Sequence, residues 1–316
     1  MIICRWPTTS PCCAWRAASL GKLLIVAERD EQQGSHMTKT ISILATALLL
    51  TAAGCNQAEA PVANGAVPDA TATAAAATSI DGTWKVDLAS AKFEEEPSVY
   101  LLKDGSYSCS TCVPPLTVAA DGAFHAVADR PYFDSMSVKT VDDKTVNLVR
   151  KKGDRIVNET TLVVSPDGKT LAFNFKNTSS PDAPPVTGKG VETRVAAAPP
   201  GSHAISGSWK TARYDNISDE GLTFSYRLEG DMLNMTSVGE SYVAKLDGTD
   251  APIKGDTAGT VVSVERLAPN SFRETFKRDG KPVSVTTMTL TEDGKMTVVS
   301  DNKMQKSTTR YTAARI

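Results

Sequence analysis

Apolar and polar residues alternate with a period of two through much of the chain from residue 80 onward. The pattern is clearest in four segments, 136–139, 161–164, 262–265 and 287–290. In an antiparallel sheet this alternation puts the apolar side chains on one face and leaves the other face solvated. We therefore expect an all-β fold of antiparallel strands, with roughly eight strands in each half of this region and no amphipathic helix.

Turn-forming dipeptides separate the alternating segments. Asp-Gly or Gly-Asp pairs occur at 104–105, 121–122, 153–154, 167–168, 247–248, 279–280 and 293–294. Asp-Gly suits the positive φ angles of tight hairpin turns. Many short strands joined by hairpins are typical of a small barrel or a sandwich, and the pattern does not distinguish the two.

The region contains an internal repeat. Ile80–Lys85 (IDGTWK) recurs as Ile205–Lys210 (ISGSWK), and the segment 151–169 matches 277–295 in length and turn position. A duplication of this kind predicts two copies of one structural unit. We expect two tandem domains, at 80–196 and 205–316, joined by an Ala/Pro-rich linker at 197–204.

Each copy opens with a Gly-X-Trp motif, at Trp84 and Trp209. Such a motif at the start of the first strand resembles the lipocalins and related calycins, in which the tryptophan closes one end of a β-barrel beneath a basic residue of the last strand. The resemblance implies two barrel-closing pairs, Trp84 with Arg194 and Trp209 with Arg310. The alternative is that both tryptophans are ordinary core residues.

A short apolar run precedes the repeats. Ile41–Ala53 carries no charge, follows Lys39 and has the length of a signal-peptide core rather than of a spanning helix. We expect a signal peptide at 37–54. Because a signal normally begins a protein, we interpret residues 1–36 as a mis-called N-terminal extension.

The apolar run ends in Ala52–Cys55 (AAGC), which resembles the lipobox of Gram-negative bacterial lipoproteins. The resemblance implies that Cys55 carries acyl chains that hold the protein in a membrane. Asn56 after the cysteine implies the periplasmic face of the outer membrane. The sequence departs from the family at Ala52, where leucine is usual, and the alternative is an ordinary secretory signal.

Residues 55–79 are rich in Ala, Thr and Pro and have no apolar periodicity. We expect a flexible tether with a coil span of roughly 25–30 Å. Without residues 1–55, which hold five basic and three acidic residues, 29 basic and 33 acidic residues remain. This mildly negative balance gives no indication of nucleic acid as a partner.

Cys109 and Cys112 form a C-x-x-C pair, which is typical of redox sites, metal sites and local disulfides. The pair follows a predicted strand rather than opening a helix, as a redox site would require. A metal site lacks further ligands, since His125 and His203 are the only histidines after residue 55. We expect a structural disulfide, with free thiols as a further alternative, and neither a metal nor a cofactor.

The loop Arg130–Asp134 has no counterpart in the second repeat. Arg130, Tyr132 and Phe133 are residue types that line ligand mouths or partner surfaces. The alternative is that the loop packs onto the end of a barrel.

No catalytic motif is present: the chain lacks G-x-S-x-G, H-E-x-x-H and a Gly-rich phosphate loop. We expect no catalytic residues and a non-enzymatic envelope lipoprotein that binds a small amphiphile or an envelope protein. The alternatives are a structural or assembly factor without a ligand pocket and a thiol-disulfide protein that uses Cys109 and Cys112.

Overall fold

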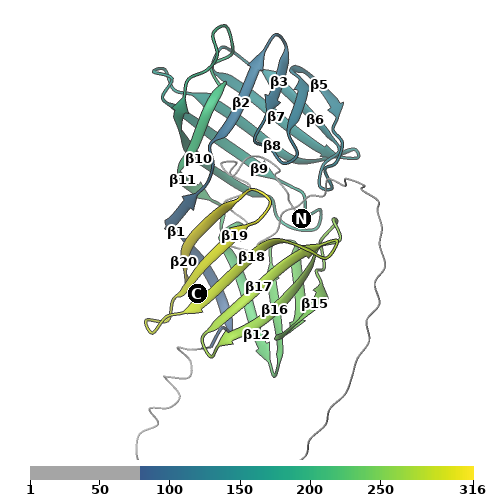
Figure 1. Cartoon of the computed structure of the whole chain (residues 1–316), viewed down its shortest axis with the longest axis vertical. Coiled ribbons are helices and arrows are strands. Elements are labelled where there is room, and N and C mark those ends of the chain that lie inside the picture. Colours follow the sequence, from purple (N-terminus) through teal and green to yellow (C-terminus); the bar gives the residue numbers. More distant parts are fainter. Residues whose placement is uncertain (1–78) are drawn as a thin grey trace, which may run out of the picture.

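The computed structural model describes residues 79–316 (Figure 1). The expected N-terminal extension, the signal peptide, Cys55 and the tether up to residue 78 lie outside the described residues. The described chain is all-β, as predicted, and forms two ten-stranded antiparallel sheets that each curl into a nearly closed barrel. No helix in residues 79–316 is long and apolar enough to cross a membrane.

The first barrel contains ten strands, each hydrogen-bonded to the next. In that order they are β4 (Leu116–Ala119), β3 (Ser106–Cys109), β2 (Ser98–Lys103), β11 (Gly207–Ile217), β10 (Val186–Ala196), β9 (Thr170–Asn177), β8 (Arg155–Val164), β7 (Thr145–Lys152), β6 (Ser135–Thr140) and β5 (Asp121–Ala126). Ten strands replace the roughly eight expected, because β3, β4 and β5 are only four to six residues long and too short to show a period.

The second barrel follows the same plan. Its strands are β14 (Glu240–Lys245), β13 (Met232–Ser237), β12 (Thr223–Glu229), β1 (Gly82–Glu94), β20 (Ser307–Arg315), β19 (Met296–Asn302), β18 (Lys281–Leu290), β17 (Ser271–Arg278), β16 (Val261–Ala268) and β15 (Asp247–Pro252). Backbone hydrogen bonds of 3.2 and 2.8 Å between Ser241 and Lys254 close the seam between the first and last strands.

The two repeats exchange their first strands. Strand β1, from the first repeat, lies between β12 and β20 in the second barrel, and β11, from the second repeat, lies between β2 and β10 in the first. The prediction that 80–196 and 205–316 form separate domains is therefore wrong for the first strand of each. Figure 1 shows the two barrels one above the other, with β1 and β11 at the junction.

The segments that follow the exchanged strands explain the exchange. Between β1 and β2 the chain has only Glu95, Glu96 and Pro97, and proline keeps its own φ fixed and the preceding residue extended. This hinge therefore continues into the other barrel instead of turning back. The other hinge contains the short helix α4 (Asp219–Leu222), the only helix among the described residues.

An aromatic cluster packs the exchanged strands together. The ring of Tyr214 on β11 lies 5.5 Å from that of Phe93 on β1 and 5.4 Å from that of Phe173 on β9. In addition, the Thr211 backbone N–H donates to the carboxylate of Glu95 in the hinge, at 3.2 Å. Because these contacts join elements of both barrels, the exchange makes the two repeats one body.

A tryptophan closes the outer end of each barrel, as the Gly-X-Trp motif predicts. Trp84 and Trp209 are fully buried, and each indole N–H donates to a backbone carbonyl four residues earlier, at 2.9 and 2.8 Å. The glycine two residues before each tryptophan is needed: Gly207 has a φ of 119°, and a Cβ there would lie 2.6 Å from Nη1 of Arg194.

The predicted tryptophan–arginine pairing is wrong in its partners. The guanidinium of Arg194 lies 3.9 Å from the ring centre of Trp209, and that of Arg315 lies 4.8 Å from the ring centre of Trp84. Arg310 instead forms an exposed ion pair with Glu94, at 3.1 Å. The strand exchange moves each tryptophan into the other barrel, and Arg315 holds the register position that Arg194 has in the first barrel.

Candidate functional site

The two barrels meet at the ends opposite their tryptophans. The loops at these ends include the disulfide loop at 110–115 and the loop at 127–134 of the first barrel, together with 253–260 and 279–280 of the second. Gly239 in the second barrel packs so closely on the first that an added Cβ would lie 2.1 Å from Oγ of Ser180. The ends of the barrels opposite the tryptophans, which we call their mouths, therefore face each other.

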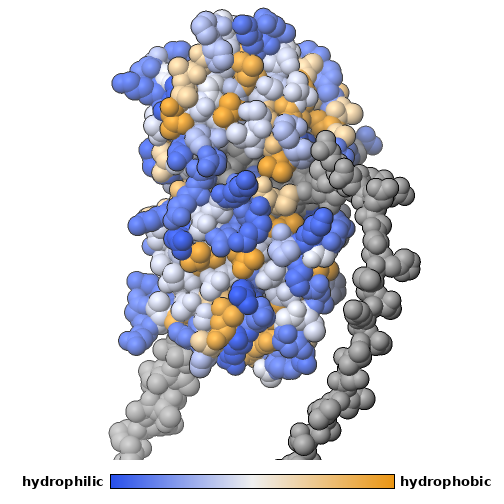
Figure 2. All heavy atoms as spheres, viewed as in Figure 1, coloured by the Kyte–Doolittle hydropathy of each residue, from blue (hydrophilic) through white to orange (hydrophobic). Residues whose placement is uncertain are grey.

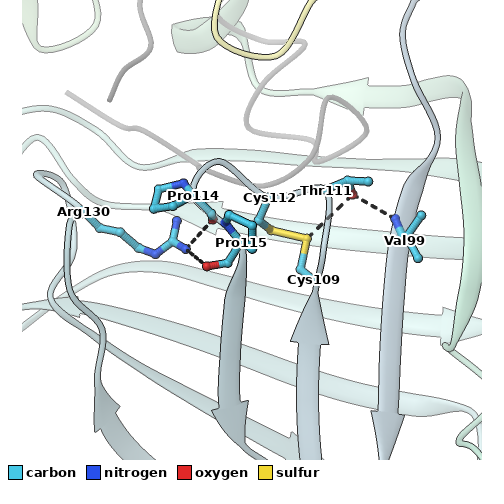
Figure 3. The surroundings of a disulfide bond; sticks show 7 residues. All are labelled: Val99, Cys109, Thr111, Cys112, Pro114, Pro115 and Arg130. Atoms are coloured by element: carbon cyan, nitrogen blue, oxygen red, sulfur yellow. Dashed lines mark hydrogen bonds between the residues drawn. A yellow bond between two sulfur atoms is a disulfide. The ribbon is translucent and has the colours of Figure 1, made fainter. Parts of the chain in front are cut away.

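Cys109 and Cys112 form a disulfide bond at this end of the first barrel, as predicted (Figure 3). Both cysteines are buried, and the Oγ1 of Thr111 between them accepts a hydrogen bond from the Val99 N–H, at 3.0 Å. Burial of both sulfur atoms argues against exchange with an external thiol. By strand register Met235 is the counterpart of Cys109 in the second barrel.

Arg130 joins the two loops that the sequence singles out. Its Nη2 donates to the carbonyl oxygens of Pro114 and Pro115, at 2.7 and 3.2 Å, just beyond the disulfide (Figure 3). Burial lowers the pKa of Arg130 to about 10. The ring of Phe133 is flanked by Arg130, at 5.6 Å, and by Arg150, at 5.5 Å. This part of the loop stabilises the mouth of the first barrel.

Tyr132 from the same loop reaches the second barrel. Its hydroxyl accepts a hydrogen bond from Nη2 of Arg278 at 2.5 Å and donates to Asp256 at 3.4 Å. Arg130, Tyr132 and Phe133 are exposed by only 6, 4 and 1%. The loop therefore covers the barrel junction and does not present these side chains as an open ligand mouth or partner surface.

The second barrel contains a buried carboxyl group that was not among the residues predicted from the sequence. Strand β17 points Phe272, Glu274, Phe276 and Arg278 inward in alternation. Glu274 is 1% exposed, and burial raises its pKa to about 7 although hydrogen bonds from two phenols oppose the change. The signal that could have found it is a carboxylate in the apolar phase of the alternating segment FRETFKR.

Three buried tyrosines surround Glu274. The hydroxyl of Tyr226 donates to Oε1 of Glu274 at 2.6 Å, and the hydroxyl of Tyr242 donates to the same oxygen. Burial raises the pKa of Tyr311, and the nearby carboxyl group of Glu274 raises it further. We call these four residues the carboxyl–tyrosine cluster.

Strand register shows that this cluster is particular to the second barrel. Val264 pairs with Glu274 where Val138 pairs with Leu148 in the first barrel, so Leu148 is the counterpart of Glu274. The counterparts of the three tyrosines are Tyr100, Leu116 and Gly190. Because the first barrel forms the same ten-stranded sheet without the cluster, the sheet does not require it.

The first barrel has a different polar interior. Arg150 donates to Oδ1 of the buried Asn158. Burial raises the pKa of Tyr107, and the nearby Tyr100, Arg150 and Glu192 also affect it. By register, Phe276 and Ala313 replace Arg150 and Glu192 in the second barrel. The first interior therefore holds charges of both signs, whereas the carboxyl–tyrosine cluster holds one acid.

Within residues 79–316, no three His, Cys, Asp or Glu side chains gather as a metal site would require. His125 contacts Asp121 at 2.8 Å, and His203 contacts the Asp142 carbonyl oxygen at 2.6 Å. No protein-family model and no curated protein sequence matches this chain.

Proposed function

We propose that the chain is a non-enzymatic, lipid-anchored envelope protein that binds a small amphiphile inside its second barrel. The observation that carries the proposal is the carboxyl–tyrosine cluster. Placing Glu274 in a barrel interior costs free energy, because burial disfavours its charged form. The first barrel has Leu148 at the same register position and forms a ten-stranded sheet of the same order. Polar groups that the fold does not need are typical of functional sites.

The surface is consistent with a protein that works through its interior. Figure 2 shows small apolar groups separated by hydrophilic residues on the face in view. The exposed large apolar residues, such as Phe124, Val195 and Leu267, come from separate strands. Scattered apolar side chains of this kind are normal for a monomer surface and do not mark a partner interface.

The membrane anchor rests on the lipobox resemblance at Cys55. Acyl chains there would hold the protein on the periplasmic face of the outer membrane, at about 0.8 kcal/mol per buried CH₂. Labelled palmitate should enter the wild-type protein and not Cys55→Ala. If the wild type incorporates none, the anchor part of the proposal is wrong.

The experiment for ligand binding is native mass spectrometry of the protein extracted from membranes. The expected result is an additional small mass on the acylated chain, lost when Glu274 is replaced by leucine, the residue at its counterpart position. A spectrum with only protein and acyl chains, together with no uptake of added amphiphiles, would refute binding.

A second function, an envelope assembly or scaffold factor, is favoured by the way the barrel mouths face each other. Tyr132 covers the mouth of the second barrel by its bond to Arg278. Large side chains, including Phe272 and Phe276, occupy the interior. A scaffold predicts cross-linking to one discrete envelope protein and no small molecule in the native mass spectrum.

A further inference from the structure

The two barrels close their seams in different ways. In the second barrel the Ser241 N–H donates to the Lys254 carbonyl oxygen at 3.2 Å, and the Lys254 N–H donates to the Ser241 carbonyl oxygen at 2.8 Å. In the first barrel β4 and β5 stand at the two ends of the sheet order, and within residues 79–316 no backbone hydrogen bond joins them. The seam of the first barrel is therefore held by something other than a backbone bridge.

A proline explains why the bridge is missing. By strand register Leu116 is the counterpart of Tyr242. One residue earlier, Pro115 is therefore the counterpart of Ser241. Proline has no backbone N–H, so Pro115 cannot donate the hydrogen bond that Ser241 donates to the other side of the seam. The first barrel therefore needs another link at this place to close its seam.

The side chain of Arg130 supplies that link (Figure 3). Arg130 lies in the loop after β5, and its Nη2 donates to the carbonyl oxygens of Pro114 and Pro115, just before β4, at 2.7 and 3.2 Å. In the second barrel the corresponding loop has the same length, and Asp256 holds the position of Arg130. An arginine across the seam is therefore particular to the first barrel.

Arg130 is buried, yet its guanidinium is only partly hydrogen-bonded. Nη2 makes both bonds to the prolines, whereas Nε and Nη1 are buried and have no hydrogen-bond acceptor among residues 79–316. A buried donor without an acceptor lowers stability, and contact with water would satisfy it. Hydration of Nε and Nη1 therefore offsets part of the cost of breaking the two bonds to the prolines, which makes the link releasable.

We propose that the first barrel opens reversibly at the seam between β4 and β5, and that Arg130 is the latch that holds it closed. When the latch releases, water reaches the interior beside the seam, including the buried disulfide of Cys109 and Cys112. The second barrel, with backbone hydrogen bonds across its seam, stays closed. Opening is a property of the first barrel alone and does not depend on a ligand in the second.

Hydrogen exchange of the full mature protein, read by mass spectrometry with residue-level fragmentation, measures the opening. In the wild type, the amides of β4 that bond to β3 should exchange about tenfold faster than the amides of β14 that bond to β13. Arg130→Gln removes both bonds of the latch, so it should speed exchange in β4 about another tenfold and leave β14 unchanged. Equal exchange in the two strands of the wild type, or unchanged exchange in β4 of a folded Arg130→Gln, would overturn the proposal.

The disulfide reports the same opening chemically. Both cysteines are buried in the closed barrel, so dithiothreitol reaches the bond only when the seam opens. Arg130→Gln should therefore be reduced about tenfold faster than the wild type. Equal rates of reduction would contradict release at the seam.

A restored backbone bond separates the latch from a general loss of stability. Pro115→Ser supplies the N–H that Ser241 has, so adding it to Arg130→Gln should return exchange in β4 to within about threefold of the wild type. The control Arg310→Gln removes an exposed arginine and should leave β4 unchanged. If Arg130→Gln does not fold, Pro115→Ser alone decides, because it should slow exchange in β4 below the wild-type rate. Absence of any slowing by Pro115→Ser would refute the seam as the place of opening.

Discussion

The buried carboxyl of Glu274 makes the stability of the protein depend on pH in a defined window. Its pKa rises from an ordinary value of 4.5 to about 7 in the folded state. Between these values the folded state holds a proton that the unfolded state has lost, so the free energy of unfolding falls as the pH rises from 4.5 to 7 and then levels off. At 1.36 kcal/mol per pKa unit, the total change is about 3 kcal/mol.

Glu274→Gln removes this titration and keeps a hydrogen-bonding side chain of the same shape. The variant should therefore gain about 3 kcal/mol relative to wild type as the pH rises from 4.5 to 7. Urea unfolding at half-unit pH intervals measures the difference. Exposed carboxyl groups with lowered pKa values, such as Asp247 at about 2, affect stability only below about pH 4. Their effect has the opposite sign, because there the free energy of unfolding falls as the pH falls.

A matched control removes a carboxyl of the same barrel that is not buried. Glu265→Gln, on the neighbouring strand β16, takes away a partly exposed group that pairs with Arg273 at 2.8 Å. This variant keeps Glu274, so its free energy of unfolding should still fall between pH 4.5 and 7. Parallel pH profiles for Glu274→Gln and wild type would refute the reasoning, because they would show that the folded state does not hold the proton.

Three further predictions concern the ends and the junction of the barrels. Arg194→Gln loses three hydrogen bonds to backbone carbonyls and the contact with the indole of Trp209, so it should lower the free energy of unfolding in urea by about 2–3 kcal/mol. The control Arg310→Gln loses only an exposed ion pair and should lower it by less than about 1 kcal/mol. Equal costs for the two variants would contradict the pairing of Arg194 with Trp209. Replacing Cys109 and Cys112 by serine should lower the free energy of unfolding by about 2 kcal/mol. Mild reductant should leave the native mass of the wild type unchanged, and easy reduction would contradict burial of the disulfide bond. Tyr132→Phe should cost about 1–3 kcal/mol through the lost hydroxyl at the junction, and no loss would show that the junction bond is unimportant.

The strand pattern and the turns could be predicted because they depend on local chemistry. Asp104 and Gly105 both have positive φ, at 51° and 71°, as do Asp279 and Gly280, at 48° and 72°. These angles match the hairpin turns that Asp-Gly indicates. The burial of both tryptophans likewise followed from a motif that acts within one short segment.

The strand exchange could not be predicted from the same pattern. Ile80–Lys85 and Ile205–Lys210 are near copies, so either strand has the periodicity to fit either barrel. The choice depends on the hinge after Glu94, where Pro97 keeps the chain extended, and on aromatic contacts between strands that are distant in sequence. The arginine partners were wrong for the same reason.

The candidate site was missed because its members are not neighbours in sequence. Tyr226, Tyr242, Glu274 and Tyr311 come from four strands, and only the barrel brings them together. The loop residues that the sequence did single out were correctly placed near a barrel end. Their role is to cover the junction, which depends on the second barrel lying against the first.

Each barrel is completed by the first strand of the other repeat, and a pair of cross-links tests this directly. Thr83 lies opposite Ser225 of the second repeat, with their hydroxyl oxygens 2.9 Å apart. Val99 holds in the first barrel the position that Ser225 holds in the second, and it lies opposite Ser208. The measurement is disulfide mapping, by mass spectrometry of peptides, for the pairs Thr83→Cys/Ser225→Cys and Thr83→Cys/Val99→Cys. The strand exchange predicts a cross-link in the first pair and none in the second, and the reverse result would contradict it.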